Sequence, residues 1–439
     1  MLDNTLAKIR RFIPTKLFHF FQPAYHYSLA LAAALWYSFP SRHIKVIGVT
    51  GTKGKSSTTE ILNAILEEAG YRTAVSNTIR HKIGDESFDN LYKMSMPGRF
   101  FVQRLIRKAV KAKCDYVILE MTSQGTLLYR HKFLHLDAFV FTNLSPEHID
   151  SHGSFENYAA AKAKIACEMI HSKKAQRTII VNGDDKEAGR FLTCEADKKM
   201  TYSAKDVEPY EILKQGITFT FGGKEHGRKV ASPLSGLFNL YNILAAANAA
   251  RSQGVNDDTI ARAITKFTGI KGRVERIEAG QKFTVIVDYA HTPDSLEKLY
   301  QVFETSSIIA ILGGTGGGRD NWKRKEMGRL ADRYCDDIIL TDEDPYDEDP
   351  KKIVADVAAG ITEIQPTIIM DRREAIREAI RRAGTNPDGT PREDGGAGIA
   401  ILITGKGTDP YIMGPNNTKT PWGDSQIAHE ELHAFLARK

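Results

Sequence analysis

The sequence predicts an α/β protein with mostly parallel sheets, and three observations lead to that fold class. From Lys45 onward, short runs of β-branched residues alternate with helical patterns, which is typical of parallel strands joined by helical crossovers. A second alternation of the same kind begins near Gly272. The 439 residues, 42% of them hydrophobic, are sufficient for two or three domains with large cores.

The individual elements follow from the apolar patterns and from the residues that bound them. In the first half we expect helices that begin at Lys55 and Phe155, and strands over 45–50, 116–120, 138–143 and 178–182. Helices over 238–254 and 257–267 follow, which places the domain boundary at 268–272. In the second half we expect strands over 284–288, 307–313, 337–341, 367–370 and 399–404. The predicted domains are therefore 1–43, a short basic and apolar segment, 44–270 and 271–439.

Charge and cysteine content exclude several classes of protein. The net charge of +6 is small against 60 basic and 54 acidic side chains, so we expect no nucleic acid partner. The four cysteines lie far apart in the sequence and form no CxxC pair, which argues against a zinc site and against a disulfide framework. We therefore expect a protein of the reducing cytoplasm.

The N-terminal segment is unusually apolar. Basic residues at 8, 10, 11 and 16 precede residues 17–41, which contain no Lys, Arg, Asp or Glu. Because Pro23 interrupts this stretch, we expect a helix over 24–39 of about 24 Å, shorter than the ~30 Å hydrocarbon core. A single membrane span and a cleaved signal peptide are not favoured. Packing against the rest of the protein and peripheral contact of residues 8–41 with the inner membrane surface are both open.

The stretch VIGVTGTKGKSSTTE, residues 46–60, is typical of a loop that holds a nucleoside triphosphate. Its glycines allow backbone N–H groups to turn toward phosphates, Lys55 offsets charge on the outer phosphates, and the Ser56 hydroxyl can complete a Mg²⁺ shell. The strict P-loop pattern has glycine at position 49, where this sequence has Val49, so the loop is a variant. The alternative is a plain tight turn between strand and helix.

Three further side chains are candidates for chemistry near this loop. Glu120 ends a predicted strand, where a carboxylate could ligate Mg²⁺, although a solvated strand-end glutamate is an equal alternative. His148 follows the next predicted strand in an acidic, polar loop, and Lys162 lies on the helix after it. A histidine with a purely structural role is the alternative for His148.

Taken in order along the chain, these and other motifs resemble the Mur ligase family, the ATP-dependent ligases that add amino acids during peptidoglycan synthesis. The motifs are TGTKGKS, the strand end at Glu120, TNLSPEHID, YAAAK, GLFNLYN, GRVE, VDYAHTP and GKG, and they cover residues 44–439. The segments DYAHTPDSLEK and TDEDP are most similar to the MurE branch, whose members add the third peptide residue.

The resemblance implies a P-loop-type central ATPase domain followed by a Rossmann-like C-terminal domain. It implies a Mg²⁺ site formed by Ser56, Glu120, His148 and Lys162, with the lysine carbamylated; an ammonium that contacts phosphate is the alternative for Lys162. The implied catalytic residues are Lys55, Lys162, His148 and Arg273. The implied ATP-binding residues are Gly51, Thr52, Lys53, Gly54, Lys55, Ser56, Ser57, Asn239, Asn242, Arg273 and Asp288. Helix capping by Asn239 and a surface position for Arg273 are the alternatives there.

The resemblance also implies two substrate regions. Thr78, Thr122 and Arg130 would bind the acceptor, and the amino acid would be bound by Arg319, Asp344, Tyr346, Gly405 and Asp409. Where the diaminopimelate ligases carry DNPR, this sequence reads Glu343-Asp344-Pro345-Tyr346, and its acidity suits the second amine of lysine or diaminopimelate. Helix capping and solvation are the alternative role of these carboxylates. About 43 residues precede the ATP domain, so we expect the usual N-terminal UDP-binding domain to be lacking and leave open a UDP-linked or lipid-linked acceptor.

We therefore expect an enzyme that forms an amide bond at the expense of ATP and Mg²⁺. A carboxylate of a muramoyl-peptide-like acceptor would be activated as an acyl phosphate, which the amine of an amino acid then attacks. A ligase of the folylpolyglutamate or cyanophycin type is one alternative. A noncatalytic ATP-binding scaffold at the membrane is the other.

Overall fold

The computed structural model describes residues 15–146, 153–222, 227–318 and 321–437, with side chains from residue 21 onward. These residues form two compact units. The first contains residues up to 206 together with 241–263, and the second contains 207–240 and the chain from 264 onward. The proposed boundary near residue 270 stays a prediction.

The first unit is built on an eight-stranded sheet in the order β4-β3-β2-β5-β1-β6-β7-β8. Its strands are β1 (Lys45–Thr50), β2 (Thr73–Ser76), β3 (Arg80–Ile83), β4 (Glu86–Asp89), β5 (Tyr116–Glu120), β6 (Ala138–Phe141), β7 (Thr178–Asn182) and β8 (Lys198–Tyr202). The pairs among β2, β5, β1, β6, β7 and β8 are parallel, whereas β3 and β4 form an antiparallel edge. The α/β fold class with mostly parallel sheets is thereby confirmed.

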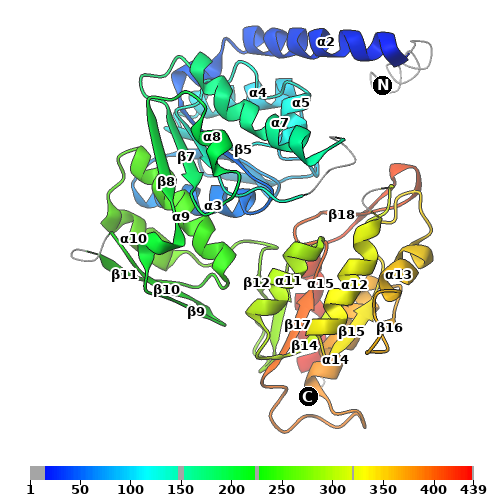
Figure 1. The fold of residues 1–439 in the computed structure, drawn as a ribbon. Coiled ribbons are helices and arrows are strands. Elements are labelled where there is room, and N and C mark those ends of the chain that lie inside the picture. Colours follow the sequence, from blue (N-terminus) through cyan, green and yellow to red (C-terminus); the bar gives the residue numbers. More distant parts are fainter. Residues whose placement is uncertain (1–14, 147–152, 223–226, 319–320, 438–439) are drawn as a thin grey trace. The chain divides into compact units, whose positions relative to one another are not determined.

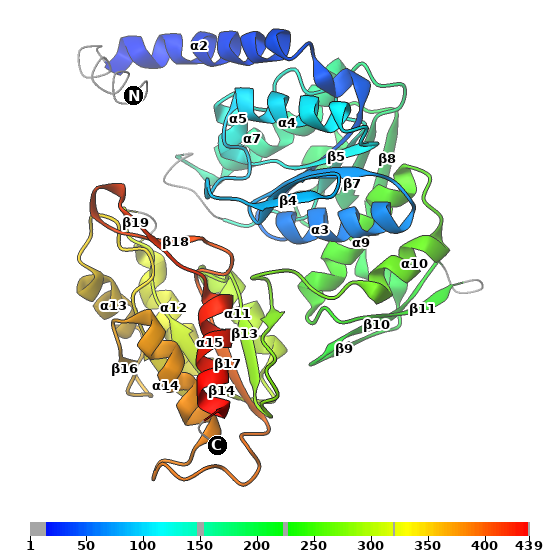
Figure 2. The same ribbon diagram turned by 180° about the vertical axis from the view of Figure 1, so that it is seen from behind.

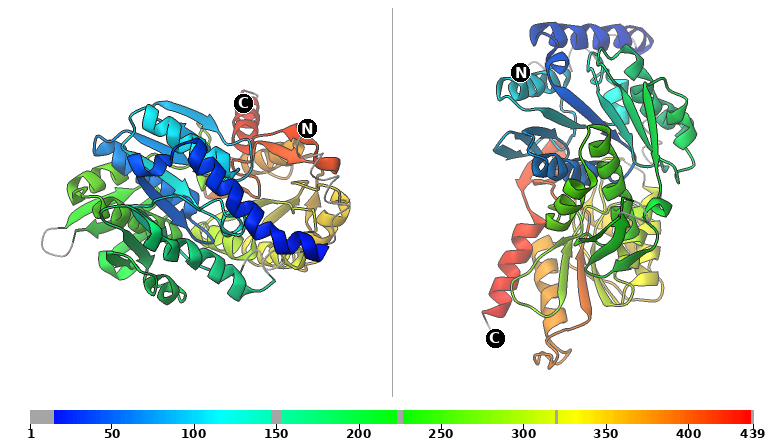
Figure 3. Two further views of the ribbon diagram at one scale, coloured as in Figure 1. Left: turned by 90° about the horizontal axis from the view of Figure 1, so that it is seen from above. Right: turned by 90° about the vertical axis from the view of Figure 1, so that its left-hand side faces the viewer.

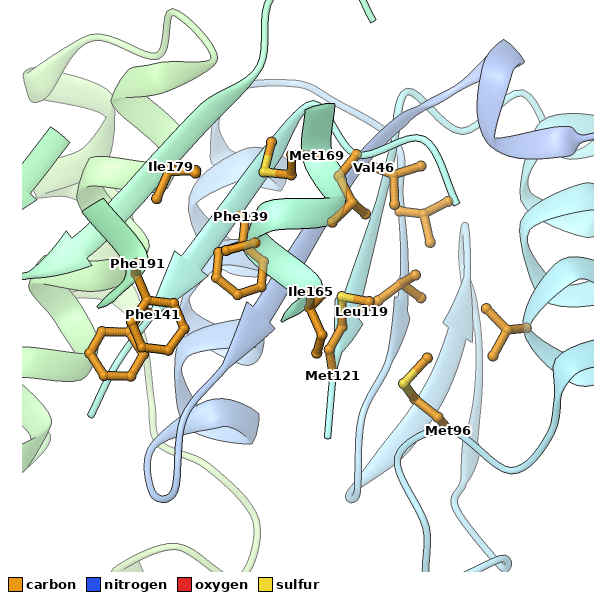
Figure 4. Close-up of a cluster of buried hydrophobic side chains, with 14 of the residues drawn as sticks. Val46, Met96, Leu119, Met121, Phe139, Phe141, Ile165, Met169, Ile179 and Phe191 are labelled. Atoms are coloured by element: carbon orange, nitrogen blue, oxygen red, sulfur yellow. The ribbon is translucent and has the colours of Figure 1, made fainter. Parts of the chain in front are cut away.

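Helices cover both faces of this sheet (Figures 1 and 2). α3 (Lys55–Glu68) packs on one face, against β1, β2 and β5. α4 (Arg99–Lys111), α7 (Phe155–Cys167) and α8 (Ala188–Leu192) cover the other face. Figure 4 shows the core there, where Phe139 and Phe141 of β6 meet Phe191 of α8 and Ile165 of α7. The short α5 (Ser123–Leu127) follows β5.

Strands β1, β5 and β7 have the bounds that the sequence predicts, because each is a continuous apolar run buried on both faces. In each, nearly every residue is buried. The predicted strand over 138–143 is two residues shorter as β6. Thr142 and Asn143, which follow it, instead hold the loop after β1.

The prediction that Pro23 interrupts the N-terminal helix is wrong. α2 (Thr15–Trp36) runs through this proline without a break. Pro23 lies on the solvent-exposed side of the helix, so water can hydrate the carbonyl group that loses its partner. α2 lies beside α4 (Figure 3), and Arg107 of α4 donates to the carbonyl oxygen of Tyr37. Within the described residues, none of the helices combines the length and the hydropathy that crossing a bilayer requires.

The expectation of no disulfide is also wrong for one pair of cysteines. Cys167, at the end of α7, and Cys194, just after α8, are joined by a disulfide bond with 4.6 Å between their Cα atoms. The two residues are 27 positions apart in the sequence, but both helices pack on the same face of the sheet. Cys114 and Cys335 are free and buried.

The second unit is built on a six-stranded sheet in the order β12-β13-β17-β14-β15-β16. Its strands are β12 (Glu275–Arg276), β13 (Thr284–Val287), β14 (Ser307–Leu312), β15 (Asp337–Leu340), β16 (Thr367–Ile368) and β17 (Ile399–Ile403), parallel except for β12. The five strands that the sequence predicts here are all present and end one or two residues earlier. A polar residue directly follows β13, β15 and β17, namely Asp288, Thr341 and Thr404.

Two helical layers cover this second sheet. α11 (Pro293–Val302), α12 (Trp322–Tyr334) and α13 (Pro350–Ala358) pack on one face, and α14 (Arg372–Gly384) and α15 (Asp424–Leu436) on the other (Figures 1 and 2). The unit also contains an antiparallel sheet of β9 (Tyr210–Leu213), β10 (Gly216–Phe221) and β11 (Arg228–Ser232), and the pair β18 (Tyr411–Met413) and β19 (Lys419–Pro421). α9 (Leu237–Ser252) and α10 (Asp257–Lys266) each contribute residues to both units.

Candidate active site

The glycine loop joins β1 to α3 and requires glycine at two positions. Gly51 has a φ of 155°, and a Cβ there would lie 1.9 Å from Thr142 Oγ1. Gly54 has a φ of 79°, and a Cβ there would lie 2.1 Å from Asn242 Oδ1. A side chain at either position would clash with the neighbouring strand end or helix. The sequence pattern therefore has a steric cause in the fold.

Hydrogen bonds hold the loop in place around its basic residues. Lys53 N donates to Asn143 Oδ1 at 2.9 Å, and Thr142 Oγ1 donates to Lys53 O at 2.7 Å. Lys55 Nζ donates to Thr52 O at 2.8 Å, so its ammonium lies back over the loop. Gly54 caps α3 without a side-chain hydrogen bond, which leaves the N–H groups of the first turn, including those of Ser56 and Ser57, oriented as an anion site requires.

Glu120 lies at the end of β5 and accepts hydrogen bonds from three separate segments of the chain. Its carboxylate accepts from Ser56 Oγ at 2.7 Å, from Thr78 N at 2.9 Å and from Ser95 Oγ at 2.8 Å. Glu120 is only 3% exposed. Burial alone would raise the pKa of this carboxyl, but the Lys55 charge and these donors hold the pKa below its usual value. The site therefore keeps a buried carboxylate ionised next to a serine hydroxyl.

Lys162 lies on α7 and contacts the beginning of the glycine loop. Its Nζ donates to Gly51 O at 2.7 Å and lies 4.8 Å from the centre of the Tyr158 ring. Tyr158 Oη is in turn 3.0 Å from Thr52 Oγ1. At 2% exposed, the Lys162 amine is buried against the loop backbone. The structure thus brings Lys55, Ser56, Glu120 and Lys162 together around one turn of chain.

His148 lies outside the described residues, so the structure says nothing of its position. Among the residues that the structure does describe, His, Cys, Asp and Glu side chains form no group of three that could hold a metal ion. Ser95 is a member of the site that sequence reasoning missed. It belongs to an irregular segment without a motif of its own, and only the fold brings it to Glu120.

Two asparagines of α9 were predicted to face adenine. Asn242 lies beside the glycine loop, because its side-chain oxygen occupies the space that a Cβ on Gly54 would need. Asn239 is buried within the first turn of α9, which begins at Leu237, and its Nδ2 donates to Ser235 O at 2.8 Å. Asn239 is therefore a residue of the helix and not its N-cap.

In the second unit, Arg273 and Asp288 lie close to the same backbone segment. The Arg273 guanidinium stacks 4.3 Å from the centre of the Tyr289 ring, and its Nη1 donates to Gly272 O at 3.0 Å. The carboxylate of Asp288 accepts from Val274 N and Ala290 N, both at 2.7 Å. These bonds fix the side chain of Asp288 at the end of β13.

The predicted amino-acid residues Asp344 and Asp409 flank a buried lysine. Lys406 Nζ donates to Asp344 Oδ1 at 2.7 Å and lies 3.7 Å from Asp409 Oδ2. The acidity noted in the sequence is therefore partly neutralised within the protein. Tyr346 has a φ of 53°, and its backbone N donates to Met413 O at 3.0 Å. Arg319 lies outside the described residues.

Glu343 belongs to the acidic segment noted in the sequence, which predicts no separate role for it. It is buried and accepts from Thr315 Oγ1 at 2.8 Å, whereas its Oε2 has no hydrogen-bond partner among the described residues. Burial and the neighbouring charge of Asp344 raise the pKa of Glu343. Gly405 leaves room for this carboxylate, because a Cβ there would lie 2.2 Å from Glu343 Oε2.

The predicted acceptor residues lie in the first unit. Thr78 donates from Oγ1 to both carboxylate oxygens of Glu120, at 3.0 and 3.1 Å. Thr122 caps α5, and its hydroxyl accepts from Gly125 N at 3.1 Å. Arg130 follows α5 and donates from Nη1 to the carbonyl oxygen of Met96.

Comparison with known proteins identifies the family of this chain. The Mur ligase middle domain matches residues 49–250, and the Mur ligase, glutamate ligase domain matches residues 272–407. The UDP-N-acetylmuramoyl-L-alanyl-D-glutamate--2,6-diaminopimelate ligase of Syntrophomonas wolfei is 35% identical over 416 residues, which cover 92% of this chain and 81% of that protein. The UDP-N-acetylmuramyl-tripeptide synthetase of a Roseiflexus species is 35% identical over 430 residues, which cover 92% of this chain and 82% of that protein.

Solved structures give the same result for the fold. A UDP-N-acetylmuramoyl-L-alanyl-D-glutamate--2,6-diaminopimelate ligase superposes with a TM-score of 0.61 at 27% identity, covering 90% of this chain and 79% of that chain. A Mycobacterium tuberculosis folylpolyglutamate synthase complexed with ADP superposes with a TM-score of 0.67 at 17% identity, covering 87% of this chain and 92% of that chain. At this identity the similarity concerns the fold alone. The two matched domains account for most of the chain, and the chain belongs to the Mur ligase family of ATP-dependent ligases.

Proposed function

We propose that this protein adds a diamino acid, diaminopimelate or lysine, to a UDP-N-acetylmuramoyl-L-alanyl-D-glutamate acceptor in peptidoglycan synthesis. The observation that carries the proposal is the cluster around the glycine loop, where Lys55, Ser56, Glu120 and Lys162 meet. The names of the related ligases supply the acceptor and support an amino acid with two amines.

The reaction has two steps that need no covalent protein nucleophile. A carboxylate oxygen of the acceptor attacks the γ-phosphorus of ATP, and ADP leaves, which forms an acyl phosphate. The amine then attacks the acyl carbon, phosphate leaves with that oxygen, and the nitrogen loses a proton. Because anions must approach one another, the protein's main contribution is positive charge, which Lys55 and Arg273 supply in this proposal.

Ser56 and Glu120 fit a magnesium site in their chemistry. Both offer oxygen ligands, the two side chains are within 2.7 Å of each other, and the carboxylate is held ionised. In the proposal His148 and Lys162 complete the site. When bound, Mg²⁺ would offset the charge of the outer phosphates.

Lys162 fits the proposed carbamate through its burial beside Gly51 O. Carbamylation would convert its end from a donor into an acceptor, and Nζ would keep one N–H for the loop carbonyl. Mass spectrometry of the native protein, prepared with and without bicarbonate, tests this modification. A single carbon dioxide adduct on Lys162 supports it, and an unmodified Lys162 in a fully active sample would exclude it.

The residues proposed to bind adenine and ribose are chosen by their positions in the structure. Asn242 borders the glycine loop, and Asn239 shares its helix, which suits a pair facing adenine. The carboxylate of Asp288 is held at the end of β13 by Val274 N and Ala290 N, and its oxygens suit ribose hydroxyls. Thr78, Thr122 and Arg130 are the proposed acceptor residues.

The choice of amino acid rests on the region of Asp344, Tyr346, Gly405 and Asp409, with Arg319. Asp344 and Asp409 both lie near Lys406 Nζ, at 2.7 and 3.7 Å, and in this proposal Asp409 receives the second amine. Asp409→Asn should raise the KM for the amino acid about tenfold, as expected for one charge-assisted contact, and change the KM for ATP less. An equal rise in both KM values would contradict this role.

We further propose peripheral membrane contact through residues 8–41. Its support is an exposed aromatic surface on and beside α2, with Trp36 at 78% exposure and Phe21, Tyr25 and Tyr27 also exposed. Residues 4–59 contain no Asp or Glu, so the segment carries only positive charge. Cosedimentation with anionic vesicles should fall for Trp36→Ser relative to the unchanged chain. Equal cosedimentation of both proteins would contradict the proposal.

The proposed activity is tested by phosphate release with UDP-N-acetylmuramoyl-L-alanyl-D-glutamate and lysine, ornithine or diaminopimelate. We expect release that depends on diaminopimelate or lysine, with a product heavier by that amino acid. Phosphate release that no amine stimulates would overturn the assignment.

A further inference from the structure

A cationic cluster lies where α2 meets the beginning of α4. Arg99, the first residue of α4, places Nη2 2.5 Å from His26 Nδ1 on α2. Arg130 lies close enough to Arg99 for their charges to interact, and it donates from Nη1 to the carbonyl oxygen of Met96. These three side chains, His26, Arg99 and Arg130, are called the α2–α4 cluster below. They come from three segments far apart in the sequence.

The positive charges of the α2–α4 cluster are not balanced by any carboxylate in the described part of the chain. Neither arginine forms an ion pair there, and the Nε atoms of both are buried without a hydrogen-bond partner. Arg99 also begins α4, where the helix dipole is positive. Two unpaired guanidinium groups at a helix N-terminus repel each other unless an anion lies between them.

The ionisation of these groups agrees with that repulsion. Burial, and then the charges of Arg99 and Arg130, lower the pKa of His26 to about 4. Burial likewise lowers the pKa of both arginines, and for Arg130 the charge of Arg99 adds to it. His26 is therefore neutral at pH 7, and its Nδ1 accepts the hydrogen bond from Arg99. An arrangement that costs stability in the empty protein is typical of a binding site.

The backbone connects the α2–α4 cluster to the glutamate of the ATP site. Ser95 donates to Glu120 at 2.8 Å, Met96 O accepts from Arg130, and Arg99 follows three residues later. Four residues of chain span at most about 14 Å. An extended alanyl-glutamate covers about 7 Å, and a sugar ring follows before the phosphates of the acceptor. The α2–α4 cluster thus lies within reach of an acceptor whose carboxylate is at Glu120.

We propose that His26, Arg99 and Arg130 bind the diphosphate of the acceptor, so that helix α2 contacts this substrate directly. The inference rests on the proposed ligase function. Arginine pairs bind phosphate oxygens in a fork geometry, and a diphosphate supplies enough charge for both guanidinium groups, whereas one carboxylate does not. The same diphosphate occurs in a nucleotide-linked and in a lipid-linked acceptor.

Direct binding tests the site without turnover. The full chain, saturated with ADP so that the glycine loop is filled, is titrated with inorganic pyrophosphate by calorimetry. Arg99→Met should weaken pyrophosphate binding about tenfold or more, as expected for the loss of a charge-assisted hydrogen bond. Arg104→Met removes the same charge from an exposed position of α4 and should leave the affinity unchanged. Equal affinity for both variants would overturn the proposal.

Kinetics then identify the source of the diphosphate. The KM is measured for UDP-muramoyl-dipeptide, for a polyprenyl-diphosphate-linked muramoyl-dipeptide in micelles, and for muramoyl-dipeptide without diphosphate. The unchanged enzyme should have a lower KM for a diphosphate acceptor than for muramoyl-dipeptide, and the diphosphate acceptor with the lower KM identifies the source. In Arg99→Met and His26→Ala, the ratio of the KM for muramoyl-dipeptide to the KM for that acceptor should fall toward one. An unchanged preference in both variants would refute the inference.

A stability measurement separates a binding role of Arg99 from a structural one, and turnover separates this inference from the ligase proposal. Arg99→Met relieves the repulsion with Arg130, so it should not lower the Tm of the unliganded protein. A lower Tm together with unchanged pyrophosphate affinity would assign Arg99 to structure alone. If no acceptor is turned over while Arg99→Met still loses pyrophosphate binding, the ligase proposal fails and the anion site stands.

Discussion

Replacing Gly54 by alanine should damage both stability and ATP binding, through two separable causes. Gly54 has a φ of 79°, so alanine there must adopt a left-handed backbone at a cost of about 1–2 kcal/mol. The new Cβ would also lie 2.1 Å from Asn242 Oδ1, which forces that side chain back by roughly 1 Å. Overpacking of this kind costs a further ~1–3 kcal/mol.

Gly70, at the other end of α3, provides a matched control. It has a φ of 86°, and no atom lies within 4 Å of the place that a Cβ would take, so Gly70→Ala carries the backbone cost alone. Urea unfolding of the two variants should therefore show a larger loss of unfolding free energy for Gly54→Ala. Only Gly54→Ala should weaken ATP binding, by about tenfold or more if the displaced Asn242 contacts the nucleotide.

The second change Asn242→Ala separates the two causes further. It removes the clash, so Gly54→Ala/Asn242→Ala should regain stability relative to Gly54→Ala, while ATP binding should stay weak. Identical losses of stability for Gly54→Ala and Gly70→Ala, with unchanged ATP affinity in both, would refute the steric reasoning.

Three other predictions follow from contacts in the two units. Lys55→Ala and Lys162→Ala should each abolish turnover and leave the circular dichroism spectrum unchanged, and full activity of either variant would exclude its role. Burial raises the pKa of Glu343, so its stability contribution is present at low pH and is lost as the pH rises through the raised pKa. Glu343→Gln should therefore raise the Tm at pH 8 and have little effect at pH 4; a lower Tm at pH 8 would contradict this. Reduction of the Cys167–Cys194 disulfide should lower the unfolding free energy by about 3 kcal/mol, and Cys167→Ser should remove that sensitivity to thiols.

The central strands could be predicted from the sequence because their apolar runs have one physical cause. β1, β5 and β7 are buried on both faces, so every position is selected for hydrophobicity, and the polar residues that follow mark the strand ends. The edge strands β3 and β4 lack this signal. β4 is exposed throughout, and only its antiparallel pairing with β3 defines it.

The candidate site was predictable to the extent that it is local in sequence. The glycine loop carries its pattern because Gly51 and Gly54 face steric constraints within a few residues of Lys55. Ser95, His26 and Arg99 have no local pattern, because their partners come from distant segments. The same holds for the disulfide bond, which joins two helix ends that sequence spacing alone cannot bring together.

The central claim is that the acceptor carboxylate is activated as an acyl phosphate by the residues around the glycine loop. An acceptor labelled with ¹⁸O in its reacting carboxylate tests this claim most directly. During amide formation one labelled oxygen should pass to the released phosphate, which mass spectrometry of the phosphate detects. Amide product accompanied by unlabelled phosphate, or by label in AMP, would contradict the account.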